Sequence, residues 1–352
     1  MEEAFVQEDK EEGSIAMENK ESVGMATNCS TEYKEEKLSL SSNAKLFSTN
    51  SNLPLAQEIA ACLGTKLGDL TVDRFSDGEI HVEMNETVRG CDVFIVAPTC
   101  PPVNDNLMEL LLVADACKRA SAGRIFAVMS YYGYARQDRK AKPREPIAAK
   151  LVADMLTVSG LSGLLTMDLH ARQIQGFYDI PVDLMSAMSI LANHYRERHF
   201  TGSDLVVVSP DLGSVARARN VAKRLDAPIA IIDKRRPKPN MSEVMNIIGD
   251  VAGKRAIIID DLIDTGGTFI NAAKALQEKG AKEIYACATH AILSGDCIER
   301  LQNSPIKELV VTNTVMLPPE KKVPMLRTLS VAHKLARGID SICQDEPMSE
   351  IE

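Results

Sequence analysis

Short apolar runs that alternate with longer helical segments constrain the fold of this chain most. The apolar runs are rich in Val, Ile, Ala and Phe and stand at residues 92–97, 124–129, 205–208, 229–232, 256–259 and 283–288. Helices are expected at residues 106–120, 147–158, 186–198, 213–224 and 268–279. Buried parallel strands are continuous apolar runs, and parallel neighbours need a crossover that is usually a helix. The alternation therefore predicts an α/β fold of mostly parallel sheets flanked by helices.

The length of the chain favours two domains. A single hydrophobic core stops growing at about 250–300 residues, and this chain has 352. Two series of strands and helices follow one another, which predicts a domain at residues 44–186 and a similar one at 187–328, with a C-terminal helix and tail at 329–352. The absence of Trp and an aromatic content of 4% predict aliphatic cores.

Charge and cysteine usage exclude several classes of partner. Residues 1–43 carry eleven acidic side chains against four lysines without a sustained apolar period, which predicts a disordered acidic tail. The remainder is nearly neutral and has no broad basic face of the kind that nucleic acid requires. Eight scattered cysteines form no CxxC pair, and no apolar run is long enough to span a membrane. We therefore expect a cytoplasmic protein with no nucleic-acid and no membrane partner, whose ligand is a small phosphate ester.

The most informative segment runs from Ala256 to Thr268. Four apolar residues precede Asp260 and Asp261, and a turn with Thr-Gly-Gly-Thr then opens a helix. Glycines let backbone amides approach a phosphate closely, and a helix N-terminus favours its negative charge. Acids at the carboxyl edge of the strand can hold ribose hydroxyls or magnesium. The segment therefore predicts a sugar-phosphate site, although a shorter Asp-Thr-Gly-Gly string would be as well explained by an acidic turn before a capped helix.

Three other polar segments follow predicted strands. Residues 166–183 contain carboxylates and an imidazole, His170, which can position Mg²⁺ on a triphosphate because that ion uses few protein ligands. Residues 131–140 supply hydrogen-bond donors. Residues 233–240 are basic and contain two prolines, which favours an exposed loop over a helix. Such charge runs are usually solvated faces, so their function depends on the whole pattern.

Together these segments resemble the phosphate-activated class of ribose-phosphate diphosphokinases, also called phosphoribosyl pyrophosphate synthetases. Phosphoribosyltransferases share the 256–268 segment but not 131–140 or 166–183. The resemblance covers about residues 46–342 and implies two phosphoribosyltransferase-like α/β domains. It implies transfer of a diphosphate from ATP to the anomeric hydroxyl of ribose 5-phosphate, giving 5-phosphoribosyl 1-diphosphate and AMP for nucleotide biosynthesis.

The resemblance also assigns roles to individual residues. It implies that the ribose 5-phosphate site comprises Asp260, Asp261, Asp264, Thr265, Gly266, Gly267 and Thr268. It implies that ATP contacts Phe75, Asp77, Glu79, Arg136 and Gln137, the first three from a neighbouring subunit. The metal ligands implied for Mg²⁺ are Asp168, His170, Asp179, Asp183 and Asp211. The loop cations implied to close over the reacting phosphates are Lys234 and Arg236, and no side chain is expected to be a nucleophile.

Assembly and regulation follow from the same resemblance. It implies a homohexamer activated by inorganic phosphate, with Lys140, Lys142 and Arg144 near the phosphate site, and inhibited by ADP. Ser214 stands where the family usually has glycine, and the final residues, 348–352, depart from the Ser-rich ending that helps to build the family's regulatory site. Two alternatives remain, a phosphoribosyltransferase and a non-catalytic paralogue that regulates active subunits.

Overall fold

The computed structural model describes residues 37–235 and 244–351. Contacts separate Met1–Lys37 from a compact unit formed by Leu38–Glu352. Most of the predicted acidic tail, residues 1–36, lies outside the described residues. Leu38, which falls within the predicted tail, is buried in a core cluster, so packing begins before residue 44.

The first sheet is entirely parallel and has the order β1-β4-β5-β6-β7. Its strands are β1 (Ala44–Ser48), β4 (Asp92–Val96), β5 (Arg124–Met129), β6 (Gly163–Met167) and β7 (Val182–Met185). The associated helices are α1 (Leu53–Cys62), α2 (Val103–Arg119), α3 (Ala148–Ser159) and, from much later in the chain, α8 (Ala332–Gln344). Helix α3 ends where Gly160 adopts a left-handed φ of 109°, which is a common way to stop a helix.

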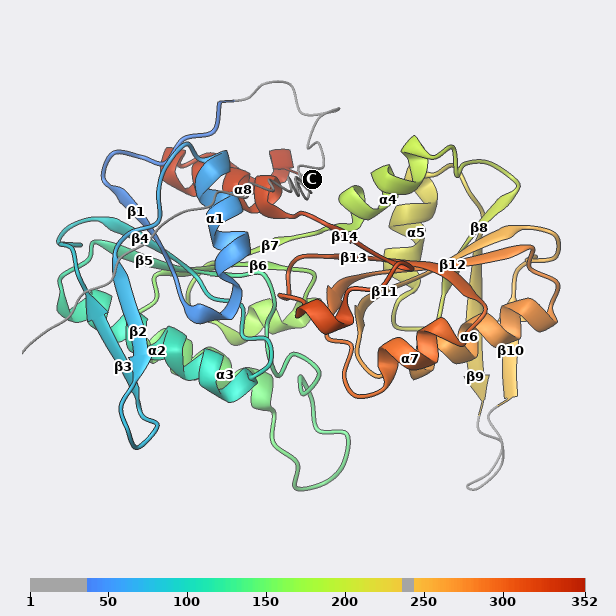
Figure 1. The fold of residues 1–352 in the computed structure, drawn as a ribbon, viewed down its shortest axis with the longest axis horizontal. Coiled ribbons are helices and arrows are strands. Elements are labelled where there is room, and N and C mark those ends of the chain that lie inside the picture. Colours follow the sequence, from blue (N-terminus) through green and yellow to red (C-terminus); the bar gives the residue numbers. More distant parts are fainter. Residues whose placement is uncertain (1–36, 236–243, 352) are drawn as a thin grey trace, which may run out of the picture. The chain divides into compact units, whose positions relative to one another are not determined.

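Helices cover both faces of this sheet (Figure 1). Successive residues of a strand point to opposite faces. Accordingly Phe47 and Ile95 pack in the cluster that contains residues of α2 and α3. Leu46 and Phe94 pack in the cluster that contains residues of α1 and α8. Helix α8 therefore returns to the first sheet after the chain has completed the second one.

The second sheet has the order β10-β9-β8-β11-β12-β13-β14. It is parallel except for the antiparallel pair β9–β10. Its strands are β8 (Leu205–Ser209), β9 (Ile229–Arg235), β10 (Val244–Ile248), β11 (Arg255–Ile263), β12 (Glu283–Ala291), β13 (Ile306–Thr312) and β14 (Leu326–Leu329). One face packs against α4 (Met188–Glu197) and α5 (Val215–Arg224), and the other against α6 (Gly267–Glu278) and α7 (Cys297–Gln302).

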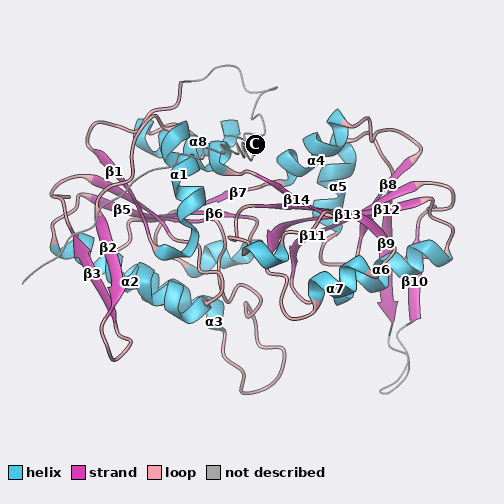
Figure 2. Cartoon of the chain, viewed as in Figure 1, coloured by secondary structure: helices cyan, strands magenta, loops and turns pink. Residues whose placement is uncertain are grey.

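The remaining elements are smaller. An antiparallel hairpin is formed by β2 (Leu70–Arg74) and β3 (Ile80–Met84) (Figure 2). The 3-10 helices are η1 (Asn50–Asn52), η2 (Arg172–Phe177), η3 (Pro319–Lys321) and η4 (Met348–Ile351). None of the helices in the described ranges is both long and apolar enough to cross a membrane.

The predicted fold class is confirmed, because both sheets are mostly parallel and flanked by helices. Two strand ends differ from the prediction. Strand β9 continues through Arg235, since β10 pairs with it as far as Arg235, so the basic segment begins inside a strand. Strand β11 continues to Ile263 because β12 pairs alongside it. Asp260 and Asp261 therefore lie within the strand and not at its end. The division near residue 186 stays a prediction, although the two sheets span residues 44–185 and 205–329.

Candidate active site

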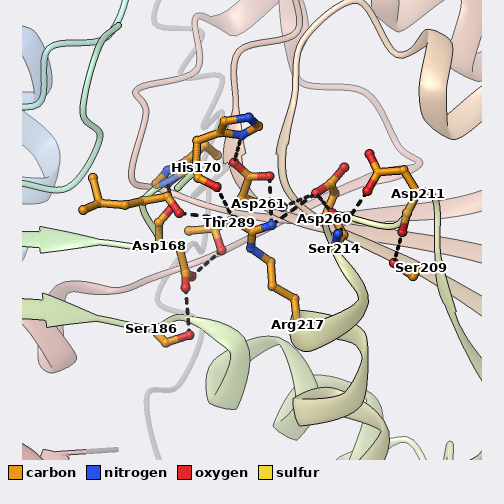
Figure 3. Close-up of polar contacts among 12 residues, drawn as sticks. Asp168, His170, Ser186, Ser209, Asp211, Ser214, Arg217, Asp260, Asp261 and Thr289 are labelled. Carbon is orange, nitrogen blue, oxygen red and sulfur yellow. Dashed lines mark hydrogen bonds and ion pairs between the residues drawn. The ribbon is translucent and has the colours of Figure 1, made fainter. Parts of the chain in front are cut away.

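Polar side chains gather where β6, β8 and β11 approach their carboxyl ends (Figure 3). In open α/β sheets this edge is where ligands bind. Strand β6 leads into Asp168 and His170, β8 leads into Asp211, and β11 carries Asp260 and Asp261. The structure thus brings residues of both sheets to one place.

Asp261 is the centre of this cluster. Its side chain is 2% exposed, and Oδ2 lies 2.8 Å from Nδ1 of His170, across the two sheets. Its Oδ1 lies 3.5 Å from a guanidinium nitrogen of Arg217. Burial acts to raise the pKa of Asp261, but the His170 hydrogen bond and the Arg217 charge bring the pKa well below its ordinary value. The same hydrogen bond raises the pKa of His170 above its ordinary value.

Arg217, on α5, links the acid pair to the loop after β6. Its Nη2 donates to the carbonyl oxygens of Leu169 and His170, each at 3.1 Å. Its Nη1 is 3.8 Å from Oδ1 of Asp260. One planar guanidinium therefore holds the backbone around His170 and both carboxylates, which suits its fixed fork of donors.

Asp260 is held by Ser214, the residue that departs from the family pattern. The Ser214 hydroxyl donates to Oδ1 of Asp260. The Ser214 backbone N–H donates to Oδ1 of Asp211 at 3.0 Å, so Asp211 is tied to the same turn. Burial and the neighbouring charge of Asp261 raise the pKa of Asp260.

The turn between β11 and α6 has the geometry of an anion site. Gly266 has a φ of +74°, and a Cβ there would lie 2.9 Å from Sγ of Cys297, so glycine is required. Helix α6 begins at Gly267, and helix N-termini bind phosphate through free backbone N–H groups. Thr265 is exposed and Thr268 is half-buried at the same turn.

Arg136 reaches this turn from the first sheet. Its Nη1 donates to Oδ2 of Asp264 at 2.6 Å. Burial acts to raise the pKa of Asp264, but hydrogen bonds from Ser294 and Arg136 outweigh it, and the pKa lies below its ordinary value. A residue predicted to hold ATP and a residue predicted to hold ribose 5-phosphate are therefore in contact.

Asp168 lies beside this cluster but its carboxylate is already engaged. Ser186 Oγ donates to Oδ1 at 2.8 Å. The backbone N–H of Ala187 and the hydroxyl of Thr289 donate to Oδ2 at 2.8 and 2.6 Å. The carboxylate is thus held by the connection between β7 and α4 and by β12 of the second sheet.

The other predicted metal ligands are spread out. Asp179 is exposed after η2, and Asp183 is half-buried on β7, where burial raises its pKa. Within the described ranges, no three His, Cys, Asp or Glu side chains are grouped so that they could hold a metal ion. Their role as ligands stays a prediction.

The predicted ATP-binding and regulatory residues lie at the surface, and the predicted catalytic residues lie where the described range ends at residue 235. The β2–β3 turn carries Phe75, which is 55% exposed, with Asp77 accepting from the Glu79 N–H at 3.1 Å. The predicted residues of the loop before α3 are all exposed, namely Arg136, Gln137, Lys140, Lys142 and Arg144. The backbone of Lys234 belongs to β9, and Arg236 lies outside the described residues.

Several residues of the cluster were not predicted from the sequence. They are Ser186, Arg217, Thr289 and His290, with Ser214 noted only as a departure. Arg217 had a usable signal, because a cation in the first turn of a helix opposes the helix dipole and needs a nearby anion. Ser186, Thr289 and His290 gave none, since nothing in their local pattern distinguishes them from ordinary strand-end residues.

Comparisons with known proteins identify one family from sequence and from structure. The profile described as the N-terminal domain of ribose phosphate pyrophosphokinase matches residues 44–160, and the phosphoribosyl synthetase-associated domain matches residues 234–351. The ribose-phosphate pyrophosphokinase of Clostridium perfringens is 60% identical over 310 residues, which cover 88% of this chain and 97% of that protein. The corresponding protein of Fusobacterium nucleatum is 56% identical over 309 residues, covering 88% and 98%.

A solved structure agrees. The crystal structure of phosphoribosylpyrophosphate synthetase from Mycobacterium smegmatis superposes with a TM-score of 0.82 at 42% identity, covering 86% of this chain and 99% of that one. Sequence motifs, fold and relatives therefore converge, and the chain belongs to the ribose-phosphate pyrophosphokinase family of diphosphotransferases.

Proposed function

We propose that this chain transfers the diphosphate of ATP to ribose 5-phosphate, giving 5-phosphoribosyl 1-diphosphate and AMP. The observation that carries the proposal is the meeting of the two sheets at the site. His170 contacts Asp261, and Arg136 contacts Asp264, so groups suited to a triphosphate lie against groups suited to a sugar phosphate. Two substrates bound on the two sides would be held next to each other.

The ribose 5-phosphate side is formed by the second sheet. The backbone amides from Asp264 to Thr268 and the start of α6 would bind the 5-phosphate. Asp260 and Asp261 would accept hydrogen bonds from the ribose hydroxyls. These carboxylates are fixed by Ser214 and Arg217, which would orient the sugar.

The ATP side is formed by the first sheet and the hairpin. Arg136 and Gln137 would hold the phosphates, with arginine supplying a forked donor. Phe75 would stack on the adenine while Asp77 and Glu79 read its edge. Phe75 is 55% exposed on the hairpin turn, which would let it reach a neighbouring subunit of a homohexamer.

The donor chemistry fits Mg²⁺ held mainly by substrate phosphates and water. Such sites use one or two protein ligands, so a cage of three carboxylates is not needed. His170 uses Nδ1 for Asp261, so its Nε2 would be left for a metal ion or its water, and Asp211 would supply a carboxylate oxygen. Bound there, the ion would neutralise charge on the triphosphate.

Catalysis would come from positioning and charge. The transition state of phosphoryl transfer spreads negative charge over the phosphate oxygens, and cations placed against it lower the barrier. Lys234, on β9, and Arg236, which lies outside the described residues, would supply them. We also propose that Lys140, Lys142 and Arg144 bind inorganic phosphate as an activator, and that the protein is cytoplasmic.

The test is AMP release by purified protein supplied with ATP, Mg²⁺ and ribose 5-phosphate, with and without inorganic phosphate and ADP. Sugar-dependent AMP formation is the expected result. AMP formation that needs no sugar, or none at all from folded protein, would contradict the proposal, and the second outcome would favour a regulatory paralogue. A response to a nucleobase and phosphoribosyl diphosphate would indicate a phosphoribosyltransferase.

Replacement of Phe75 by alanine is expected to raise the KM for ATP about 10-fold, because stacking on a base contributes about 1–3 kcal/mol. The KM for ribose 5-phosphate should be unchanged. Steady-state kinetics with each substrate varied in turn measure both values. The matched control is Leu53→Ala, another exposed apolar side chain, and an equal rise in both variants would rule out a specific adenine contact.

Replacement of Ser214 by alanine is expected to raise the KM for ribose 5-phosphate about 5-fold, the equivalent of one hydrogen bond of about 1 kcal/mol. The hydroxyl lowers the pKa of Asp260, so its loss raises that pKa further and leaves less carboxylate to accept from the sugar. Glycine, the usual residue of the family, should behave like alanine. An unchanged KM in both variants would separate Asp260 from sugar binding.

A further inference from the structure

The carboxylate of Asp168 is buried where the two sheets meet. Asp168 follows directly on β6, is 9% exposed, and adopts a left-handed φ of +40°, which is uncommon for a residue other than glycine. A residue held in such a conformation is fixed by its surroundings. The hydrogen-bond donors to its carboxylate come from two other segments of the chain.

The hydrogen bonds to the Asp168 carboxylate identify those segments. Ser186 and Ala187, which donate at 2.8 Å each, stand between β7 and α4, where the chain passes from one sheet to the other. Thr289, which donates at 2.6 Å, lies in the middle of the second sheet on β12. Figure 3 shows the carboxylate between Ser186 and Thr289. One side chain therefore joins the first sheet, the connection and the second sheet.

A buried network continues behind this contact. His290 places Nε2 3.3 Å from the backbone oxygen of Asp168 and Nδ1 2.9 Å from the Thr314 hydroxyl. The Thr312 hydroxyl donates to the backbone oxygen of Thr289 at 2.7 Å. Satisfied networks of this kind are rigid and fix one arrangement of the segments that they join.

The same contacts make Asp168 a poor metal ligand. A cation must approach a carboxylate through its lone pairs, and here donor groups already face about three of the four lone-pair sites, two on Oδ2 and one on Oδ1. The Ser186 and Thr289 hydroxyls could rotate, but the Ala187 N–H belongs to the backbone and cannot. His170, two residues on, is partly exposed and free of this constraint.

We propose that Asp168 and Thr289 form a clasp that sets the loop carrying His170 against Asp261, and that Asp168 is a positioning residue rather than a magnesium ligand. This inference rests on the proposed function, in which ATP is held by the first sheet and ribose 5-phosphate by the second. The clasp then determines how the two bound substrates face each other. Its loss lowers kcat and leaves both KM values nearly unchanged, because each substrate keeps its own contacts.

The experiment uses three variants, Thr289→Val, Asp168→Asn and the double variant that combines them. Each is compared with Thr166→Val as a control. Thr289→Val keeps the shape of the side chain and removes only the hydroxyl. Thr166→Val is the matched control, since Thr166 is equally buried and its hydroxyl donates to Met129 within the first sheet alone. Each protein is measured for kcat, both KM values and the Mg²⁺ concentration at half-maximal rate, at a temperature where all are folded. Thermal unfolding in EDTA gives a readout without metal or substrate.

The expected kcat is about 10-fold lower for Thr289→Val and up to about 100-fold lower for Asp168→Asn, since a displacement of about 1 Å can cost that much. The double variant should be no worse than Asp168→Asn, both in kcat and in melting temperature in EDTA, because the two changes break one contact. Thr166→Val should lose stability but keep its kcat. The half-maximal Mg²⁺ concentration should stay within about twofold of the original in every variant.

Three results would overturn the clasp. The first is an unchanged kcat in Thr289→Val, and the second is losses of kcat that add up in the double variant. The third is a rise of about tenfold or more in the Mg²⁺ requirement of Asp168→Asn with none in Thr289→Val, which is what the loss of a metal ligand predicts. Failure of the proposed function looks different, because the unmodified protein would then form no sugar-dependent AMP. In that case the melting temperatures in EDTA still test the clasp, because they need neither metal nor substrate.

Discussion

Replacing Lys234 with alanine is expected to lower kcat by about 10²–10³-fold, the usual cost of removing one group that stabilises transition-state charge. The KM values should change little, because a cation that closes over the reacting phosphates acts in the transition state more than in substrate binding. Sugar-dependent AMP release measures the loss. Unfolding and assembly should be unaffected, since Lys234 stands next to the end of β9.

The matched control is Lys223→Ala, which removes an exposed cation from α5. It changes the net charge equally and should keep the original turnover. If Lys234→Ala also kept it, the basic segment would have no part in catalysis. A large rise in the KM for ATP at constant kcat would instead make Lys234 a binding residue.

Replacing Asp261 with asparagine is expected to lower the free energy of unfolding by about 3 kcal/mol, because removing one partner of a buried ion pair leaves the other charge without compensation. Arg217 is the charge that loses its nearer carboxylate, being largely buried between Asp261 and the carbonyls of Leu169 and His170. The value is set at the lower end of the range because those carbonyl hydrogen bonds remain and Asp260 stays 3.8 Å from Nη1 of Arg217. Denaturant unfolding measures the change.

The same substitution should abolish most of the turnover, since His170 loses the carboxylate that orients its ring. Asp154→Asn is the control, because Asp154 makes an exposed ion pair with Lys150 on α3 and surface pairs contribute little. It should retain both stability and activity. Full activity in Asp261→Asn would show that the contact between His170 and Asp261 is not needed for the reaction.

The sequence predicted the α/β class because buried parallel strands and their crossover helices leave strong local patterns. Strand β5 agrees with its prediction residue for residue, and α3 is shifted by one. Strand β10 had no such pattern, and the strand character of Lys234 depends on pairing with it. Pairing with a distant strand also extends β11 past Asp261. These features depend on partners that a local pattern does not reveal.

The site was predictable only in part for the same reason. Phosphate-binding turns are local, so the segment from Asp264 to Thr268 carries its own signature, and the left-handed Gly266 agrees with it. The contacts of Asp168 with Thr289 and of His170 with Asp261 join residues about a hundred positions apart. A motif can name such residues, but it cannot say whether a carboxylate points at a metal ion or at a neighbouring hydroxyl.

The return of α8 to the first sheet has a consequence for how the protein is made. One apolar face of that sheet, including Leu46 and Phe94, shares its core with Leu335 and Ile339, and the Ser39 N–H bonds to Asp340, 301 residues away. Helix α1 covers part of this face early, but a ribosome must synthesise the whole second sheet before α8 can cover the rest. Until then the nascent first sheet exposes apolar surface, which attracts chaperones or other chains. A fragment that stops before residue 332 should aggregate, although it contains every residue assigned to the active site.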